Sequence, residues 1–307
     1  MSARRARALT LTAVAAALLG AGLAGCGGHV RAAAAQTPSQ RFAQLLGHRP
    51  TGIAATIAAR GTLVVGEDAE FAPQSSVGST GAWSGFDVDV AQQVATLLDV
   101  NVEIRELDWA RVPAALRGAR YDVAISSIAT DPAPAKGLAF TAPYAYSTAQ
   151  IVVRAGSAPI TTLAGLSGKA IGASATTTCQ RFLEAASGVQ VELYTTDADA
   201  VADVGNGSLA GAMTADTTAV TIRAGGAAIT AAGLGFFYQP QAFAAEPGQT
   251  DLIALLDSAI RSMRASGELT RLSRRWYHGL DVSARPAGVP TFTKALAMLK
   301  AGTYPTQ

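Results

Sequence analysis

The sequence predicts an α/β protein built as two lobes with a ligand cleft between them. Short apolar runs, which are typical of buried strands, alternate with segments of helical periodicity, and the alternation occurs in two successive blocks, at residues 62–153 and 170–276. The chain has 307 residues, of which 49% are hydrophobic, so each block is large enough to bury a core. In open α/β sheets ligands bind at the carboxyl ends of strands, which is where we expect the cleft.

The first block is expected to hold four strands and two helices. Its longer helix opens at Phe86 and its shorter one covers residues 112–116. Three prolines between residues 132 and 143 then interrupt the periodicity. The strands are expected at residues 62–66, 102–107, 123–125 and 151–153, and the apolar face of the longer helix carries Val90, Val94, Leu97 and Leu98.

The second block repeats this pattern and ends in two helices. Leu252, Leu255 and Leu256 begin an apolar stripe that continues through Ala259 and Met263, which is the spacing of a long amphipathic helix. The last helix ends near Trp276, and we expect residues 283–307 to form a peripheral tail. Strands are expected at residues 170–173, 191–194 and 211–214, and shorter helices at residues 179–186, 198–204 and 218–224.

The N-terminal segment, residues 1–25, is interpreted as an export signal. Arg4, Arg5 and Arg7 precede an uncharged apolar stretch, and residues 23–26 (LAGC) match a bacterial lipobox, in which Cys26 is lipidated and becomes the new N-terminus. The alternative is an uncleaved membrane anchor with an incidental cysteine. Residues 26–56 are then expected to be a tether, with a short helix at residues 39–46.

Charge and cysteine content exclude several classes of protein. The formal charge is +2, and removal of the three arginines of the signal segment leaves +2 − 3 = −1, which argues against a nucleic-acid binder. If Cys26 is lipidated, Cys179 has no partner for a disulfide. No phosphate-binding loop motif and no zinc-type cluster of cysteine and histidine is present, so we expect neither a cofactor nor a metal.

Five ordered motifs resemble one family. They are GTLVVGED at residues 61–68, GFDVD at 85–89, FTAPY at 140–144, LAGLSGKAIG at 163–172, and residues 266–276 from SGEL to the tryptophan. Together they resemble the family-3 extracellular solute-binding proteins, which are polar amino-acid receptors of ABC importers. The resemblance implies a periplasmic-binding-protein fold with two hinge strands, and closure of the lobes on the ligand. Lobe one would comprise residues 57–152 and 239–282, and lobe two residues 153–238.

The resemblance also implies a set of ligand-binding residues. Asp68 and Phe71 would lie at the cleft mouth, and Thr177 and Thr178 would open a helix, with Thr176 at the family's glycine position. The structural alternatives are a turn cap for Asp68, core packing for Phe71 and Trp109, and helix or turn caps for the hydroxyls. We interpret Asp87 and Asp89 as structural, with Asp87 as a helix N-cap. The remaining ligand-binding positions would be Trp109, Ser126, Ser127, Ala129 and Thr130.

Two positions depart from the family pattern. A gapless alignment puts Pro134 where the family has an arginine for the ligand carboxylate, and Ala215, followed by Asp216, where it has an aspartate for the ammonium. Loss of one partner of a buried charge pair costs about 2–5 kcal/mol. Binding of an ordinary amino acid therefore requires other residues that replace the missing arginine and aspartate. Asp216 can replace the aspartate after a shift of one residue, and Lys136 can extend toward the position of the arginine. Otherwise the ligand is less charged or larger than an amino acid.

The expected function is that of a monomeric, lipid-anchored, extracytoplasmic receptor on the cell membrane. It would bind a small polar solute, an amino acid or a similar molecule, and deliver it to the membrane subunits of an ABC permease. One alternative is a sensory or accessory lipoprotein with a degenerate site. The other is an enzyme that uses cleft carboxylates, drawn from Glu67, Asp68, Glu70 and Asp216; it is disfavoured because all three histidines lie outside the two blocks.

Overall fold

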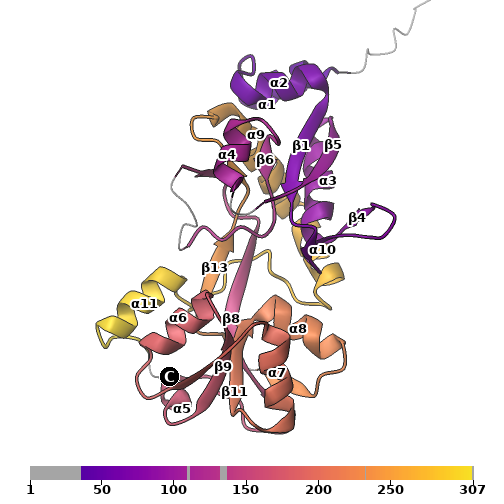
Figure 1. Ribbon diagram of the computed structural model, residues 1–307. Helices are drawn as coiled ribbons and strands as arrows, with labels where there is room; N and C mark the ends of the chain where they lie inside the picture. Colours follow the sequence, from indigo (N-terminus) through magenta and orange to yellow (C-terminus); the bar gives the residue numbers. More distant parts are fainter. Residues whose placement is uncertain (1–35, 109–110, 132–136, 232, 306–307) are drawn as a thin grey trace, which may run out of the picture. The chain divides into compact units, whose positions relative to one another are not determined.

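The computed structural model describes residues 36–108, 111–131, 137–231 and 233–305, which form one compact unit with two lobes, each built on its own sheet (Figure 1). The sheet of the first lobe has β1 (Thr62–Glu67) between β5 (Asn101–Glu106) and β6 (Val123–Ala124), all parallel. β14 (Ala244–Ala245) is antiparallel to both of its neighbours, β6 and β7 (Ala139–Phe140), and β7 completes the sheet at its edge. The strands expected at residues 62–66, 102–107 and 123–125 are therefore confirmed.

The core of the first lobe includes three helices, α3 (Phe86–Leu98), α9 (Thr250–Ala265) and α10 (Glu268–Trp276). The sequence predicts the apolar faces of α3 and α9. Val90, Val94 and Leu98 of α3 meet Leu252, Leu255 and Leu256 of α9 in one buried cluster with Leu63 and Val65 of β1. The short helix α4 (Val112–Arg117) covers a smaller cluster on the same sheet.

The second lobe contains the second sheet, in the order β10, β9, β11, β8, β12. β9 (Ala170–Ser174) is parallel to both neighbours, β10 (Gln190–Tyr194) and β11 (Gly211–Ala215), as βα units require. The edge strand β12 (Ile229–Ala231) is antiparallel to β8. The helices are α5 (Leu163–Leu166), α6 (Thr178–Ala185), α7 (Asp197–Asn206) and α8 (Asp216–Ala224).

Two long strands connect the lobes. β8 (Ala145–Arg154) and β13 (Phe237–Gln241) run antiparallel, with Ala145 opposite Gln241 and Ala149 opposite Phe237. At the first-lobe end of this pair the N–H of Tyr144 donates to the carbonyl of Gln241 at 2.9 Å, and β14 follows three residues later. Figure 1 shows β8 and β13 running between the two sheets. These are the two hinge strands that the family resemblance implied.

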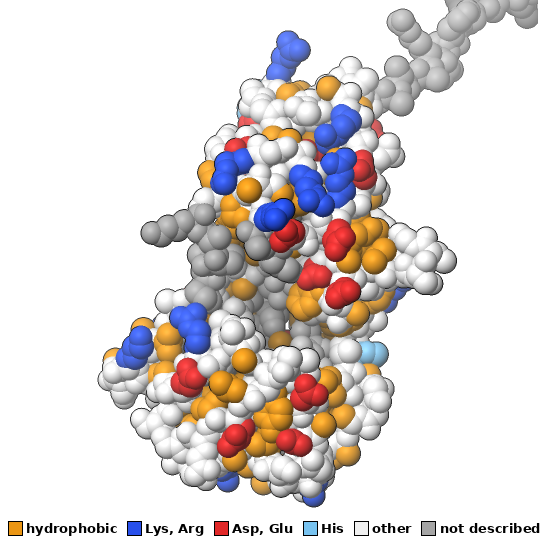
Figure 2. Space-filling model, in the orientation of Figure 1, with side chains coloured by type: hydrophobic (Ala, Val, Ile, Leu, Met, Phe, Trp, Pro, Cys, Tyr) orange, Lys and Arg blue, Asp and Glu red, His pale blue; other side chains and the backbone are white. Residues whose placement is uncertain are grey.

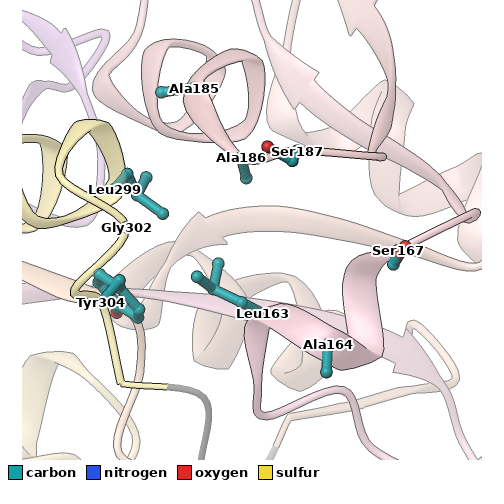
Figure 3. Close-up of a pocket in the computed structure, with 9 residues that line it drawn as sticks. All are labelled: Leu163, Ala164, Ser167, Ala185, Ala186, Ser187, Leu299, Gly302 and Tyr304. Atoms are coloured by element: carbon teal, nitrogen blue, oxygen red, sulfur yellow. The ribbon is translucent and has the colours of Figure 1, made fainter.

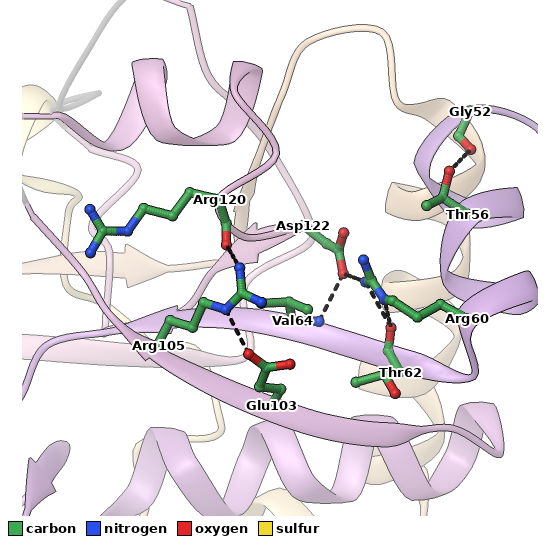
Figure 4. A network of polar contacts seen from close by, with 9 residues as sticks. All are labelled: Gly52, Thr56, Arg60, Thr62, Val64, Glu103, Arg105, Arg120 and Asp122. Atoms are coloured by element: carbon green, nitrogen blue, oxygen red, sulfur yellow. Dashed lines mark hydrogen bonds and ion pairs between the residues drawn. The ribbon is translucent and has the colours of Figure 1, made fainter.

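The tether expected at residues 26–56 is wrong for its second half, although the short helix expected at residues 39–46 is confirmed. Residues 38–60 form two helices, α1 (Pro38–Leu46) and α2 (Gly52–Arg60), whose Phe42 and Ile57 are buried in the core of the first lobe. Arg60 pairs with the carboxylate of Asp122, which also accepts the N–H of Val64 at 2.8 Å, and so ties α2 to the sheet (Figure 4). Each helix has only nine residues, with one buried residue in α1 and three in α2, so the sequence alone does not separate them from a tether.

The C-terminal segment expected as a peripheral tail contains a packed helix, α11 (Phe292–Lys300). Phe292 and Ala295 are buried in the core of the second lobe, where α11 lies against α6 and β13. The side chain of Asp131, in the loop after β6, accepts the N–H of Thr293 at 3.1 Å. The segment after α10 therefore joins the second lobe, although α10 itself belongs to the first.

A small antiparallel sheet, which the sequence did not predict, follows β1. It consists of β2 (Glu70–Phe71), β3 (Ser75–Val77) and β4 (Trp83–Ser84), and strands of two or three residues carry no readable period. Gly85 then begins α3 at φ +144°, where a Cβ would stand 2.2 Å from the carbonyl oxygen of Gln74. The N-cap of α3 is therefore Gly85, and the prediction of Asp87 as N-cap is wrong: Asp87 lies in the first turn and is fully buried.

Over the described part of the chain, no helix combines the length and the apolar character needed to cross a membrane. On the face shown in Figure 2, acidic and basic side chains are interspersed with apolar ones. Charge of both signs is therefore spread over this face.

Candidate functional site

A cavity of about 330 Å³ is walled by both lobes. The first lobe supplies Phe71 of β2 and the loop that follows β6, and the second lobe supplies the segment that leads into α6. Gln239 of the connecting strand β13 closes one side. The lining residues are Phe71, Ser126, Ser127, Ile128, Ala129, Thr176, Thr177, Thr178, Arg181 and Gln239.

On the first-lobe wall, Ser127 is held by a buried acid. Its hydroxyl donates to Asp87 at 2.9 Å, and its N–H donates to the hydroxyl of Tyr144, which itself donates to Asp87 at 2.7 Å. These bonds keep Ser127 in the left-handed region at φ +49°, which a non-glycine residue adopts at a cost. Burial raises the pKa of Asp87 to about 7. Asp87 therefore acts as a support beneath the pocket wall.

On the second-lobe wall, three threonines form the entry to α6. Thr177 is the N-cap: its hydroxyl oxygen accepts the N–H of Gln180 at 3.2 Å and donates to the carbonyl of Ser174 at 2.7 Å. This is the structural role that we considered as the alternative to ligand contact. Thr176 has φ +63°, a left-handed conformation that explains why the resemblance places a glycine there.

Gln239 connects the walls through its side-chain amide. Its Oε1 accepts the hydroxyl of Thr178 at 3.0 Å, and its Nε2 donates to the carbonyl of Asp131 at 3.2 Å. One amide thus joins α6 of the second lobe to the loop after β6 of the first. Gln239 is not among the ligand-binding residues predicted from the sequence, because it lies within a strand and not in a loop or motif.

Arg181 is the second lining residue that was not predicted from the sequence, and it alone among the ten lining residues carries a formal charge. It follows Thr178 by three residues, a spacing that puts both on one face of α6. This spacing is the signal that could have identified it. Its guanidinium carbon lies 5.0 Å from the centroid of the Phe292 ring.

Six of the predicted ligand-binding residues meet at this cavity, namely Phe71, Ser126, Ser127, Ala129, Thr177 and Thr178. Asp68 is adjacent to it, since its N–H donates to the hydroxyl of Ser126 at 3.3 Å. Thr130 donates its N–H to the carbonyl of Pro240 at 2.8 Å and does not line the cavity. Trp109, Pro134 and Lys136 lie outside the described residues.

The structure does not place Asp216 among the lining residues. Its Oδ1 accepts the N–H groups of Thr148 at 3.1 Å and of Thr217 at 2.8 Å, and burial raises its pKa to about 6. The carboxylate is therefore occupied by one backbone donor of β8 and one at the start of α8. Ala215, the position of the missing aspartate, ends β11 and is the N-cap of α8.

The carboxylates considered for an enzyme are dispersed. Glu67 is fully buried in the first lobe, where burial and then the nearby Asp87 raise its pKa well above the usual range. Glu70 is exposed on β2. Within the described ranges no group of three or more His, Cys, Asp or Glu side chains is arranged to hold a metal ion.

A second cavity, of about 310 Å³, lies within the second lobe between α5, the end of α6 and the C-terminal segment (Figure 3). Its lining is formed by Leu163, Ala164, Ser167, Ala185, Ala186, Ser187, Leu299, Gly302 and Tyr304. No charged side chain is among these described residues, and the hydroxyl of Tyr304 already bonds to the carbonyl of Phe236. The cavity between the lobes is the better candidate for a polar ligand.

Two α/β lobes, two connecting strands and a pocket with walls from both lobes define the extracellular solute-binding class of proteins. The chain belongs to the family described as bacterial extracellular solute-binding proteins, family 3, whose model matches residues 63–279.

Individual relatives agree with this assignment. The L-cystine-binding protein TcyJ of Escherichia coli is 29% identical over 235 residues, covering 76% of this chain and 88% of TcyJ. A probable amino-acid ABC transporter-binding protein of Haemophilus influenzae is 30% identical over 227 residues, covering 72% and 86% of the two chains.

A solved structure supports the fold. The L-cystine solute receptor of Neisseria gonorrhoeae, in its unliganded open conformation, has a TM-score of 0.66 and 22% identity. The similarity covers 76% of this chain and 100% of that receptor.

Proposed function

We propose that the protein is a lipid-anchored extracytoplasmic receptor that binds a small amino-acid-like solute between its lobes and delivers it to an ABC importer. The observation that carries this proposal is the pocket itself: serine, threonine and glutamine residues from both lobes and a connecting strand line one cavity of about 330 Å³, a volume suited to a small molecule. The names of the relatives, which include an L-cystine-binding protein and a probable amino-acid ABC transporter-binding protein, point to the same class of ligand.

The proposed mechanism is binding without chemistry. β8 and β13 are the connections that would bend as the lobes close. The hydroxyl of Thr178, the amide of Gln239 and the loop at Ser127 would then meet the ligand from three sides. Arg181, a poor acid or base, is the lining residue with a formal charge, so the described lining supports a receptor better than an enzyme.

A thermal-shift screen tests this proposal. The soluble form starts at Gly27 and retains every described residue, and the panel holds the standard amino acids, L-cystine, small peptides and betaines. We expect an amino acid or a close analogue to raise the melting temperature, because a ligand at a hundred times its dissociation constant stabilises by about 2.7 kcal/mol. A folded protein that shows no shift with any compound would contradict receptor function.

The pocket variant Gln239→Ala serves as the matched test of location. It removes the amide that bonds Thr178, and we expect a weaker shift with the same ligand. Gln92→Ala is the control, since Gln92 is exposed on α3 in the first lobe. An equal loss in both variants would count against the pocket as the binding site.

The anchor and the monomeric state belong to the same proposal, and residues 1–35 lie outside the described part of the chain. We expect the full chain to fractionate with membranes and Cys26→Ala to be released or to accumulate as the unprocessed precursor. Cys179→Ala is the control, because its thiol lies in α6 of the folded unit. Membrane association of Cys26→Ala at the wild-type processed mass would overturn lipidation at this cysteine.

A further inference from the structure

A positively charged side chain without a protein counter-charge lies in the pocket wall. Arg181 is exposed and lines the cavity, and no ion pair or side-chain hydrogen bond to it is found among the residues that the structure describes. None of the other nine lining residues carries a charge. The cation is therefore available to a ligand.

The C-terminal helix holds this cation in place. The guanidinium carbon lies 5.0 Å from the centroid of the Phe292 ring, within the range of a cation–π interaction. Phe292 is itself buried and packs edge-on against Phe237, at 5.1 Å between ring centroids. A guanidinium that stacks on a fixed ring keeps the donors at its planar edge free for a bidentate acceptor.

The surroundings of Arg181 suit a carboxylate. The hydroxyl of Thr178 lies on the same face of α6, and the helix begins at Thr178, so its first N–H groups and its dipole favour negative charge. A planar anion of two oxygens matches the guanidinium fork better than a spherical anion does.

We propose that Arg181 binds the carboxylate of the solute and that Phe292, from the C-terminal helix, positions the guanidinium for it. This inference rests on the proposed receptor function and names one of its ligand contacts. It assigns two residues to ligand specificity, one in α6 and one in the segment after α10.

Titration calorimetry on the soluble form tests the inference with L-cystine and its dimethyl ester. If another amino acid gives a larger thermal shift than L-cystine, that amino acid and its methyl ester are used instead. A hydrogen bond to a charged group contributes about 1.5–3 kcal/mol, so Arg181→Ala should weaken binding of the acid by about 10- to 150-fold. Arg181→Gln, which is polar but neutral, should do the same, and Arg181→Lys should recover part of the loss. Phe292→Leu, which keeps an apolar side chain in the core, should weaken binding by several-fold.

The ester distinguishes direct contact from an indirect effect. Wild-type protein should bind the ester more weakly than the acid, and Arg181→Ala should bind acid and ester about equally, because the two changes remove the same interaction. Arg261→Ala, which removes an exposed arginine of α9 in the first lobe, is the control and should bind both compounds as the wild type does.

The outcomes separate the two proposals. If the Arg181 variants bind the acid as tightly as wild-type protein does, the assignment of Arg181 is overturned while receptor function stands. The same conclusion follows if the affinity lost by esterification of the ligand and the affinity lost by mutation of Arg181 are additive. If folded wild-type protein binds no amino acid, both proposals are overturned.

Discussion

The buried carboxyl of Asp87 should make the stability of the protein depend on pH. Asp87 is fully buried beneath the pocket, its pKa is raised to about 7 by that burial, and it accepts hydrogen bonds from Ser127 and Tyr144. In the unfolded chain an aspartic acid titrates at about 3.9. The folded state therefore holds a proton over a pH range in which the unfolded state has released it.

The sign and size of the effect follow from this difference. Below about pH 4 the carboxyl is protonated in both states and does not affect stability. As the pH rises from there to about 7 the unfolded state ionises first, and the free energy of unfolding falls. At about 1.4 kcal/mol for each pH unit of difference, the decrease between pH 5 and pH 8 is about 2–3 kcal/mol. Glu67, whose pKa is raised as well, adds to it in the same direction.

Urea unfolding followed by circular dichroism at pH 5 and pH 8 measures this effect. Between pH 5 and pH 8 the free energy of unfolding should fall by about 2–3 kcal/mol more in wild-type protein than in Asp87→Asn, because asparagine does not ionise. Asp99→Asn is the control: Asp99 is exposed at the end of α3 with φ 58°, a conformation that asparagine accepts. Equal pH dependence in wild type and Asp87→Asn would refute the reasoning.

Three further predictions concern packing and reactivity. Phe42→Ala should destabilise by about 3–5 kcal/mol in urea, because Phe42 is fully buried between α1 and the first-lobe core; a loss below about 1 kcal/mol would mean that the N-terminal helices are not packed there. Gly85→Ala should destabilise by about 1–3 kcal/mol or more, since its Cβ would stand 2.2 Å from the carbonyl of Gln74, and wild-type stability in the same assay would contradict this geometry. Burial raises the pKa of the Cys179 thiol, so iodoacetamide at pH 8 should label it slowly in folded protein and quickly in urea, as read by mass spectrometry; equal rates would show an accessible thiolate.

The sequence predicts the elements whose side chains repeat over several turns or strands. α3 and α9 have 13 and 16 residues, long enough for the apolar stripe to show, and the parallel strands β1, β9 and β11 are short apolar runs between them. α1, α2 and α11 have nine residues each and few buried positions, so their packing depends on surfaces that the rest of the fold provides. For that reason the sequence predicted the helix at residues 39–46 only as part of a tether, and it did not predict that these three helices pack against the lobes.

The candidate site also contains some residues that the sequence predicts and others that it does not. Loops at strand ends and helix starts are readable, and Ser126, Ser127, Thr177 and Thr178 do meet at one cavity. Arg181 and Gln239 lie inside regular elements, where a side chain faces the pocket only because of how α6 and β13 are placed.

Asp216 shows the opposite error. The sequence offers a carboxylate near the expected ammonium position, but the backbone N–H groups of Thr148 in β8 and Thr217 in α8 already occupy it. Hydrogen bonding to local backbone donors is a common use of aspartate at such positions, and sequence position alone does not distinguish it from ligand binding.

A crystal structure of the soluble form with the panel compound that binds most tightly would test the receptor proposal most directly. We expect one ligand in the cavity between the lobes, enclosed by Phe71, Ser127, Thr178 and Gln239, with its carboxylate on Arg181. A ligand bound in the cavity between α5, α6 and the C-terminal segment instead, or on the outer surface of either lobe, would contradict the proposed site.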